Sequence, residues 1–184
     1  MKLIVGVCGA SGITYAVALL KALREKKIET FLVMSNWAEK LVDDETDFKV
    51  SEIKKLASHC YSNSDMEAPI ASSSFLVDGM IVIPATVKTI SEIATADCST
   101  LISRACDNML KTRKKLVVCV RETPLSPPAL RNLYDISLFG GIVFPLSPAF
   151  YHKPKNIKDL ESFITGKLLD LFEIKNEKFK RWGK

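Results

Sequence analysis

The sequence predicts an α/β fold built on a mainly parallel sheet. Short runs of β-branched and other apolar residues, such as 3–8 and 116–120, are typical of strands buried on both faces. An amphipathic segment long enough for a helix follows most of these runs, and Gly-, Ser- or Pro-containing turns separate them. Strands that alternate with helices favour right-handed crossovers, which place the strands parallel in one sheet.

The size and composition of the chain indicate one domain. The 184 residues are 47% apolar, which is enough for one sizeable core. We therefore expect a single domain over residues 1–184, with residues 173–184 as a C-terminal tail. No apolar run reaches the roughly 18 residues of a membrane span, and a signal-peptide pattern is missing, so we expect a cytoplasmic protein without a membrane partner.

Charge and cysteine content limit the kinds of ligand and metal site that the sequence predicts. The net charge of +5 comes largely from residues 111–115 and the last ten residues, and aromatic residues are not interleaved with these runs. This pattern favours an anionic ligand or a solvated face over nucleic acid. The five cysteines include no C-x-x-C pair, so we expect reduced thiols and neither a disulfide framework nor a metal site.

In the first half of the chain, the strand at 3–8 opens into Gly9-Ala10-Ser11-Gly12 and then into a helical pattern at 13–27. The two glycines allow a close backbone approach, and unpaired N–H groups at the start of the helix favour an anion. The turn is neither a G-x-G-x-x-G dinucleotide fingerprint nor a P-loop. A Gly-rich turn without a ligand remains an alternative for this stretch alone. The further elements expected here are a strand at 30–34, a helix at 37–42, an irregular region at 43–75 and within it a helix at 52–58.

In the second half, a strand at 79–83 ends at Pro84 and opens into a hydroxyl-rich turn at 85–89. The Pro-rich loop at 124–128 precedes a helix because proline is favoured in the first helical turn. The further elements expected here are helices from residue 90 and at 101–114, a strand at 116–120, a helix at 129–138, a strand at 142–144 and a helix at 157–172.

Four predicted strand ends carry residues suited to a ligand. They are Gly9 to Gly12, Ser35, Ala85 to Thr89, and Arg121 with Glu122. Because the carboxyl ends of parallel strands share one edge, these residues should meet there. Glycine turns, hydroxyls and an arginine suit a flat cofactor with a phosphate tail, which makes FMN a sensible candidate.

A second group of charged residues has open interpretations. If 99–114 is helical, Arg104, Asn108 and Lys111 share one face and could clamp a phosphate, although a merely solvated face explains the spacing too. Glu122 could act as an acid or base if burial raises its pKa, or it could be a salt-bridged strand cap. His59 and His152 lack metal-ligand spacing and are expected to be structural or exposed.

The chain resembles the flavin prenyltransferase (UbiX/Pad) family over nearly its whole length. The resemblance rests on seven motifs in order, which are Gly9-Ala10-Ser11-Gly12, Ser72-Ser73-Ser74-Phe75, Pro84-Ala85-Thr86-Val87-Lys88-Thr89, Asp107-Asn108, Val120-Arg121-Glu122-Thr123-Pro124, Leu130-Arg131-Asn132-Leu133 and Pro148-Ala149-Phe150-Tyr151. It implies a three-layer, Rossmann-like (flavodoxin-like) flavoprotein. It also implies transfer of a dimethylallyl group from dimethylallyl phosphate to N5 and C6 of reduced FMN, without a metal. The sequence leaves a diphosphate donor open as an alternative to the monophosphate.

The resemblance also implies roles for individual residues. Those implied to hold FMN are Gly9, Ala10, Ser11, Ser35, Thr86, Val87, Lys88, Thr89 and Arg121. Those implied to hold the substrate phosphate are Arg104, Lys111, Tyr151 and Lys167. Those implied to be catalytic are Glu122 as the acid or base, Ser11 near the reacting centre, Lys111 and Tyr151. Trp182 is implied as a lid over the active site, and Glu45 as a contribution from a neighbouring subunit.

The implied partners are a UbiD-type decarboxylase, which receives the product, and further copies of this chain in a dodecamer of trimers. Two alternatives remain. An FMN-dependent cysteine decarboxylase would carry Pro-Ala-Ser-Ala-Asn-Thr where this chain has Pro84 to Thr89 without an asparagine. A non-catalytic flavin carrier would need no second phosphate clamp, so the group formed by Arg104, Lys111, Tyr151 and Lys167 argues against it.

Overall fold

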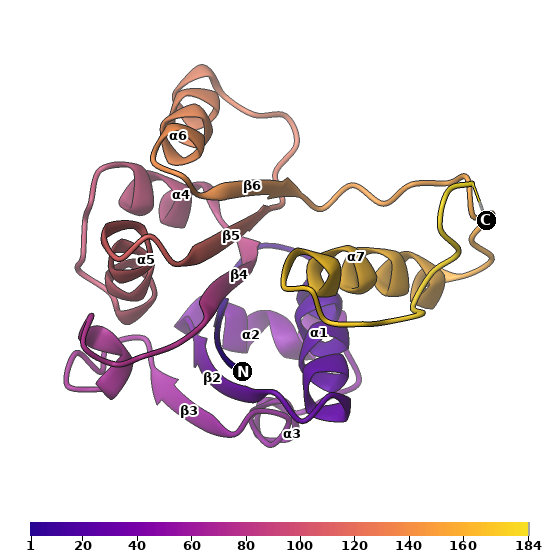
Figure 1. Ribbon diagram of the computed structural model, residues 1–184, viewed down its shortest axis with the longest axis horizontal. Helices are drawn as coiled ribbons and strands as arrows, with labels where there is room; N and C mark the ends of the chain where they lie inside the picture. The colour runs from indigo at the N-terminus through magenta and orange to yellow at the C-terminus, as the bar shows by residue number, and fades with distance from the viewer. Residues whose placement is uncertain (184) are drawn as a thin grey trace.

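Six parallel strands form the centre of the protein in the computed structural model, which describes residues 1–183 (Figure 1). They are β1 (Lys2–Val7), β2 (Glu29–Met34), β3 (His59–Ser62), β4 (Gly79–Ala85), β5 (Lys115–Val120) and β6 (Ile142–Pro145). Their order across the sheet is β3-β2-β1-β4-β5-β6, so the order reverses between β1 and β4. Ligands of open α/β sheets bind at the carboxyl ends of the strands beside such a reversal.

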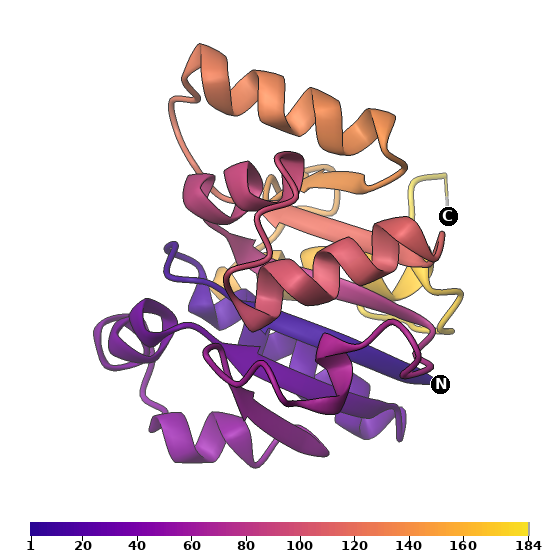
Figure 2. The same ribbon diagram turned by 90° about the vertical axis from the view of Figure 1, so that its left-hand side faces the viewer.

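Helices cover both faces of the sheet (Figures 1 and 2). They are α1 (Ile13–Glu25), α2 (Asn36–Glu45), α3 (Val50–Lys54), α4 (Val87–Ala94), α5 (Leu101–Lys111), α6 (Pro127–Leu138) and α7 (Ile157–Leu171), with a short 3-10 helix η1 (Pro69–Ala71). The core beneath α1, α2 and α7 contains Leu3 and Val5, whereas the core beneath α4, α5 and α6 contains Ile4. Successive strand residues thus serve opposite faces, as the period of a strand requires. The expected three-layer α/β fold is confirmed.

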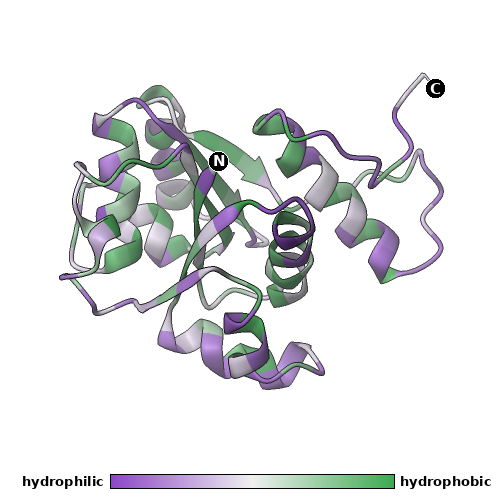
Figure 3. Ribbon diagram, turned by 60° about the horizontal axis from the view of Figure 1, so that its bottom comes forward, coloured by the Kyte–Doolittle hydropathy of each residue, from purple (hydrophilic) through white to green (hydrophobic). Residues whose placement is uncertain are grey.

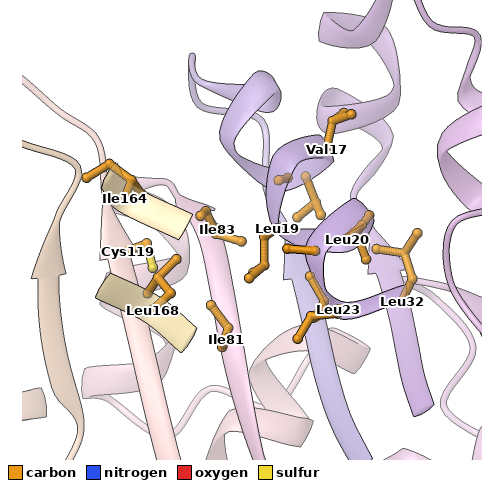
Figure 4. Packing of buried hydrophobic residues seen from close by; sticks show 14 of the residues in the cluster. Val17, Leu19, Leu20, Leu23, Leu32, Ile81, Ile83, Cys119, Ile164 and Leu168 are labelled. Carbon is orange, nitrogen blue, oxygen red and sulfur yellow. The ribbon is translucent and has the colours of Figure 1, made fainter. Parts of the chain in front are cut away.

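The core on the α1 and α7 face explains why these helices stay in place. Leu19 and Leu23 of α1 and Leu168 of α7 are fully buried and pack around Ile81 and Ile83 of β4 (Figure 4). Burying one such side chain contributes about 1.5–3 kcal/mol. Hydrophobic residues accordingly concentrate on the strands and inner helix faces in Figure 3, with hydrophilic residues outside.

Several element boundaries differ from the sequence expectation. The helix expected at 52–58 is Val50–Lys54 (α3), and the helix expected at 101–114 ends at Lys111. Strand β3 lies inside the region 43–75 that was expected to be irregular, because this short edge strand is largely exposed and has no apolar run. Strand β4 continues through Pro84 to Ala85, which is possible because the pairing register with β5 shifts between Val82 and Ala85. Helix α4 begins at Val87 rather than near residue 90, since Thr86 caps it. Val87 therefore lies in a first helical turn, not in a loop as its motif suggested.

Residues 146–156 form an arm that leads from β6 away from the sheet to α7 (Figure 1). The tail, described here over residues 173–183, folds back along α7 toward this arm. Residue 184, the last of the expected tail, lies outside the described residues. Among residues 1–183, none of the helices has the length and hydropathy of a membrane span.

Candidate active site

A cavity of about 440 Å³ lies at the carboxyl edge of the sheet, beside the reversal of strand order. Four strand ends contribute to it, which are those of β1, β2, β3 and β4. Its lining residues are Cys8, Gly9, Ser35, Asn36, Trp37, Asn63, Ser64, Thr86, Lys88, Thr89, Glu92, Ser99, Thr100 and Ile102. The cavity therefore combines hydroxyl and amide groups with an apolar wall, as a flat nucleotide-like ligand would need.

The N-termini of three helices meet at this cavity. Ser35, Thr86 and Thr100 cap α2, α4 and α5, and each side-chain oxygen accepts a hydrogen bond from the backbone N–H three residues later, at 3.1–3.2 Å. The remaining N–H groups of the first turns and the positive ends of the helix dipoles favour an anion. This arrangement fits a phosphate group.

The N-terminus of α1 has a different partner. The Glu45 carboxylate accepts hydrogen bonds from the backbone N–H groups of Gly12 and Ile13, both at 2.8 Å. The N–H groups expected to await a ligand anion are thus already paired with a carboxylate. In this structure Glu45 is bound within its own chain, at the end of α2, and the contribution to a neighbouring subunit that the family resemblance implies stays a prediction.

Gly9 has a packing reason to be glycine. A Cβ atom at this position would lie 2.4 Å from Cβ of Trp37 and 3.1 Å from its backbone carbonyl carbon. Trp37 itself stays 67% exposed at the cavity, with the Lys40 ammonium 4.4 Å from its ring centroid. The first turn of α2 therefore explains why position 9 is glycine, and the predicted close approach of its backbone to a ligand stays a prediction.

A chain of hydrogen bonds joins the turns that follow β1 and β4. The Thr89 hydroxyl donates to the Cys8 sulfur at 3.3 Å and lies 3.0 Å from the Thr86 hydroxyl. Burial raises the pKa of the Cys8 thiol to about 11, and the Thr89 hydrogen bond offsets part of that rise. The thiol is neutral at pH 7, so Cys8 is a packed hydrogen-bonding group in this cavity rather than a nucleophile.

The structure brings together most residues predicted to hold FMN. Gly9, Ser35, Thr86, Lys88 and Thr89 all line the cavity. Ala10, Ser11 and Val87 are not among the lining residues but follow directly in the same two turns.

The Arg121–Glu122 pair follows the neighbouring strand β5. Arg121 and Glu122 are both exposed in the isolated chain. Glu122 accepts a hydrogen bond from the backbone N–H of Thr123 at 3.1 Å. The pair stands outside the cavity lining, so its contact with a ligand stays a prediction.

The residues predicted to hold the substrate phosphate are divided between the two faces of the sheet. Arg104 and Lys111 lie on α5, and Lys167 lies on α7, which covers the opposite face. Lys111 is paired with Asp107 at 3.0 Å. Asn108 was expected on the same face as the two cations, but it is buried and donates to the carbonyl of Ile70 at 3.3 Å, because α5 turns that position toward the core.

Tyr151 and Trp182 accompany Lys167 on the far side. Tyr151 belongs to the arm, and its ring contacts the Trp182 ring edge-to-face at a centroid distance of 5.2 Å. His152 stacks on Phe163 of α7 at 5.2 Å with nearly parallel rings. The contacts of Trp182 are thus with the arm and not with the cavity of its own chain, so the lid role implied for it stays a prediction.

Several lining residues escaped the sequence reasoning. They are Cys8, Asn36, Trp37, Asn63, Ser64, Glu92, Ser99, Thr100 and Ile102. Asn63 follows β3, and it accepts from the N–H groups of Leu101 and Ile102 at 2.9 and 3.0 Å, which fixes the start of α5. Its signal is its position at a strand end, which could be used only if β3 were recognised as a strand. The serine motif 72–74 precedes β4 and stands outside the cavity lining.

A larger cavity, of about 710 Å³, lies between α1, α7 and the segment 45–52. Of the predicted site residues it includes only Glu45, whose carboxylate is paired with the α1 N-terminus. Its wall mixes lysines with a larger number of acidic side chains. Because the strand ends and helix N-termini converge on the smaller cavity, the smaller one is the better candidate for the chemistry.

A doubly wound parallel sheet with a polar, helix-capped cavity at its reversal point defines a nucleotide- or flavin-binding α/β protein. The family described as Flavoprotein matches residues 1–139. The chain is 45% identical over 183 residues to "Flavin prenyltransferase UbiX" of Methanocaldococcus jannaschii, covering 100% of this chain and 99% of that protein. It therefore belongs to the flavin prenyltransferase family, and the resemblance found in the sequence is confirmed.

A further relative and a solved structure support the same family assignment. "Flavin prenyltransferase LpdB" of Lactiplantibacillus plantarum is 45% identical over 182 residues, covering 98% of this chain and 97% of that protein. The crystal structure of AnUbiX (PadA1) in complex with FMN and dimethylallyl pyrophosphate matches with a TM-score of 0.98 and 43% identity, covering 100% and 97% of the two chains. The cysteine decarboxylase SpaF, at 17% identity and a TM-score of 0.65, shares the fold alone.

Proposed function

We propose that this protein is a flavin prenyltransferase that binds reduced FMN at the carboxyl edge of its sheet and transfers to it a dimethylallyl group from dimethylallyl phosphate. The observation that carries the proposal is the site at the β1–β4 reversal, together with 43% identity over the whole chain to a structure that holds FMN and a dimethylallyl donor.

The cavity residues fit FMN. Three capped helix N-termini supply positive potential for a phosphate, while Ile102 and Trp37 give an apolar wall for a flat ring. Lys88 belongs to the proposed binding set, but its ammonium is paired with the buried Glu92 carboxylate of the same lining, which offsets its charge. Gly9 and Ser35 offer backbone and hydroxyl groups at the same edge. Ala10, Ser11, Val87, Thr86, Thr89 and Arg121 complete the proposed binding set. FMN, when bound, supplies the ring atoms N5 and C6 that accept the dimethylallyl group.

The cationic residues are proposed to drive departure of the phosphate. Arg104, Lys111 and Lys167 would hold the phosphate oxygens, and the Tyr151 hydroxyl would donate a hydrogen bond to them. Fixed positive charges stabilise the negative charge that develops on the leaving group, and they need no reorganisation when the bond breaks. Glu122 would take the proton released at C6, with Ser11 close to the reacting atoms.

The division of these cations between two faces supports a site shared between copies of the chain. Arg104 and Lys111 lie on α5 and Lys167 lies on α7, on opposite faces of the sheet, which disfavours a donor site formed by all three within one chain. A dodecameric UbiX-like decarboxylase from Escherichia coli O157:H7 matches this chain with a TM-score of 0.97 and 40% identity, covering 100% of both chains. We propose a homo-oligomer, a dodecamer assembled from trimers, in which α5 of one chain and the arm and α7 of another form one donor site.

Two finer features belong to the same proposal. The product would be delivered to a UbiD-type decarboxylase. The protein would work in the cytoplasm, which is supported by five free cysteines, since a reducing compartment keeps thiols unpaired.

The test is an anaerobic incubation of the purified protein with reduced FMN and dimethylallyl phosphate, followed by mass analysis of the released flavin. A flavin heavier by one C5H8 unit, formed without added metal, is the expected result. Unmodified FMN that stays tightly bound would contradict the proposal and favour a flavin carrier. Release of carbon dioxide from a peptide with a C-terminal cysteine would instead favour a cysteine decarboxylase.

A further inference from the structure

The tail is held to α7 by a two-point ion pair. Both terminal nitrogens of the Arg181 guanidinium donate to the Asp170 carboxylate, at 2.8 Å each. The Asn176 side chain donates to the same carboxylate at 3.0 Å and to the carbonyl of Gly166 at 3.3 Å. Paired, parallel hydrogen bonds between a guanidinium and a carboxylate fix orientation as well as distance. The direction of the tail beside Arg181 is therefore set by Asp170.

An aromatic contact fixes the tail one turn earlier on α7. The ring of Phe179 lies on Gly166, where an added Cβ atom would be 2.5 Å from the Phe179 ring. The same ring meets Phe163 at a centroid distance of 5.0 Å, and the Arg181 guanidinium lies 5.3 Å from its centroid. Gly166 thus provides the space into which Phe179 fits.

These contacts place Trp182 directly against Tyr151. The two rings meet edge-to-face at 5.2 Å, and Tyr151 in turn meets Phe163 edge-to-face at 6.0 Å. Trp182 is nevertheless 80% exposed, so its own packing holds it weakly. The preceding residue, Arg181, supplies the strong attachment.

We propose that Asp170 and Arg181 are positioning residues that hold Trp182 and Tyr151 as one fixed unit, so that the Tyr151 hydroxyl and Lys167 reach the donor phosphate together. Neither Asp170 nor Arg181 touches the substrate in this proposal. They act through Trp182, because Arg181 precedes it in the chain and anchors it to the helix that carries Lys167. The role in donor binding rests on the proposed prenyl transfer, whereas the attachment itself does not.

The experiment uses the full-length protein, with Trp37 kept for the kinetics because it lines the proposed FMN cavity, and with Trp37→Phe for the fluorescence, which leaves Trp182 as the single tryptophan. Time-resolved fluorescence anisotropy without ligand reports the local motion of Trp182, and steady-state kinetics report KM for dimethylallyl phosphate. Arg181→Ala and Arg181→Lys are compared with Arg131→Ala. The last variant removes a matched exposed arginine–aspartate pair, formed with Asp135 on α6.

Arg181→Ala should add a fast anisotropy decay and raise KM for the donor by about tenfold, with the FMN dissociation constant unchanged, because the phosphate ligands lose their fixed placement. Arg181→Lys keeps the charge without the paired hydrogen bonds, so its anisotropy decay and KM should lie between those of Arg181→Ala and the parent. Arg131→Ala should match the parent in both.

An unchanged decay in Arg181→Ala, or a fast decay with an unchanged KM, would overturn the proposal. A parent protein that makes no prenylated flavin would defeat the proposed function. In that case the assigned role in donor binding falls with it, while the anisotropy still shows whether Asp170 and Arg181 hold Trp182.

Discussion

Replacing Glu45 with alanine should destabilise the protein by removing the carboxylate at the N-terminus of α1. Its two hydrogen bonds, to the N–H groups of Gly12 and Ile13, are both 2.8 Å long and partly buried. A hydrogen bond to a charged group contributes about 1.5–3 kcal/mol, and solvent replaces part of it at a half-exposed site. We expect a total loss of about 2–3 kcal/mol, which lowers Tm by about 4–12 °C for a chain of this size. Glu45→Gln keeps one acceptor oxygen without the charge and should lose about 1 kcal/mol.

Thermal unfolding followed by circular dichroism at a fixed protomer concentration measures this effect, because assembly would otherwise shift Tm. Asp44→Ala is the matched control, since Asp44 is an exposed acid on the same helix. Sulfate should restore part of the Tm of Glu45→Ala relative to chloride at equal ionic strength, because the vacated N–H groups then accept an external anion. Equal losses in Glu45→Ala and Asp44→Ala would refute the reasoning.

Three further predictions concern the cavity, the donor site and the tail. Thr89→Val removes the hydroxyl between Cys8 and Thr86, so it should weaken FMN binding, measured by titration, and lower the free energy of unfolding by about 1 kcal/mol. Thr95→Val, at the residue that follows the same helix, should leave FMN affinity unchanged. Lys111→Ala and Lys167→Ala should each abolish prenyl transfer but retain FMN. Coexpression of the two variants should restore about a quarter of the active sites if α5 of one chain and α7 of another form each site. No recovery of activity would indicate that both cations belong to a site within one chain. The hydrogen bond from Arg181, aided by Asn176 and the charge of Lys167, lowers the pKa of Asp170 from 3.8. The Asp170–Arg181 ion pair therefore stabilises the folded tail above that pH, and this stability is lost as the pH falls through the lowered pKa. Trp182 anisotropy should drop over that acid range in the parent and stay low at all pH values in Asp170→Asn.

Much of the fold follows from local sequence pattern. Buried strands such as β1 and β5 can be recognised in the sequence as continuous runs of β-branched and other apolar residues, because both of their faces pack against helices. The edge strand β3, with the sequence His-Cys-Tyr-Ser, gives no such signal because most of it is exposed. Its stability comes from pairing with β2, from Phe31 opposite His59 to Met34 opposite Ser62, which is information that no local window contains.

The cavity was predictable to the extent that it follows strand ends. Gly9, Ser35 and Thr86 each come directly after an apolar run, and parallel strands bring such positions to one edge. Asn63 serves the same edge but follows the strand that was missed. The sequence could not predict that Glu45 binds the N-terminus of α1, because this contact depends on how the end of α2 packs beside α1.

The placement of α7 was the decisive unknown for the donor site. Its amphipathic pattern predicts a buried face but does not say which side of the sheet receives it, and the arm at 146–156 carries the chain back to the α1 side. That crossing separates Lys167 and Tyr151 from Arg104 and Lys111, although all four suit one phosphate. In the proposed enzyme the donor site therefore forms only when chains associate. A single chain would bind FMN, but its cations would not be gathered around the donor phosphate. Assembly would then control when the allylic group is released, and the tail, by fixing Tyr151 and Trp182 on the incoming surface, would determine how precisely the two halves of the clamp meet.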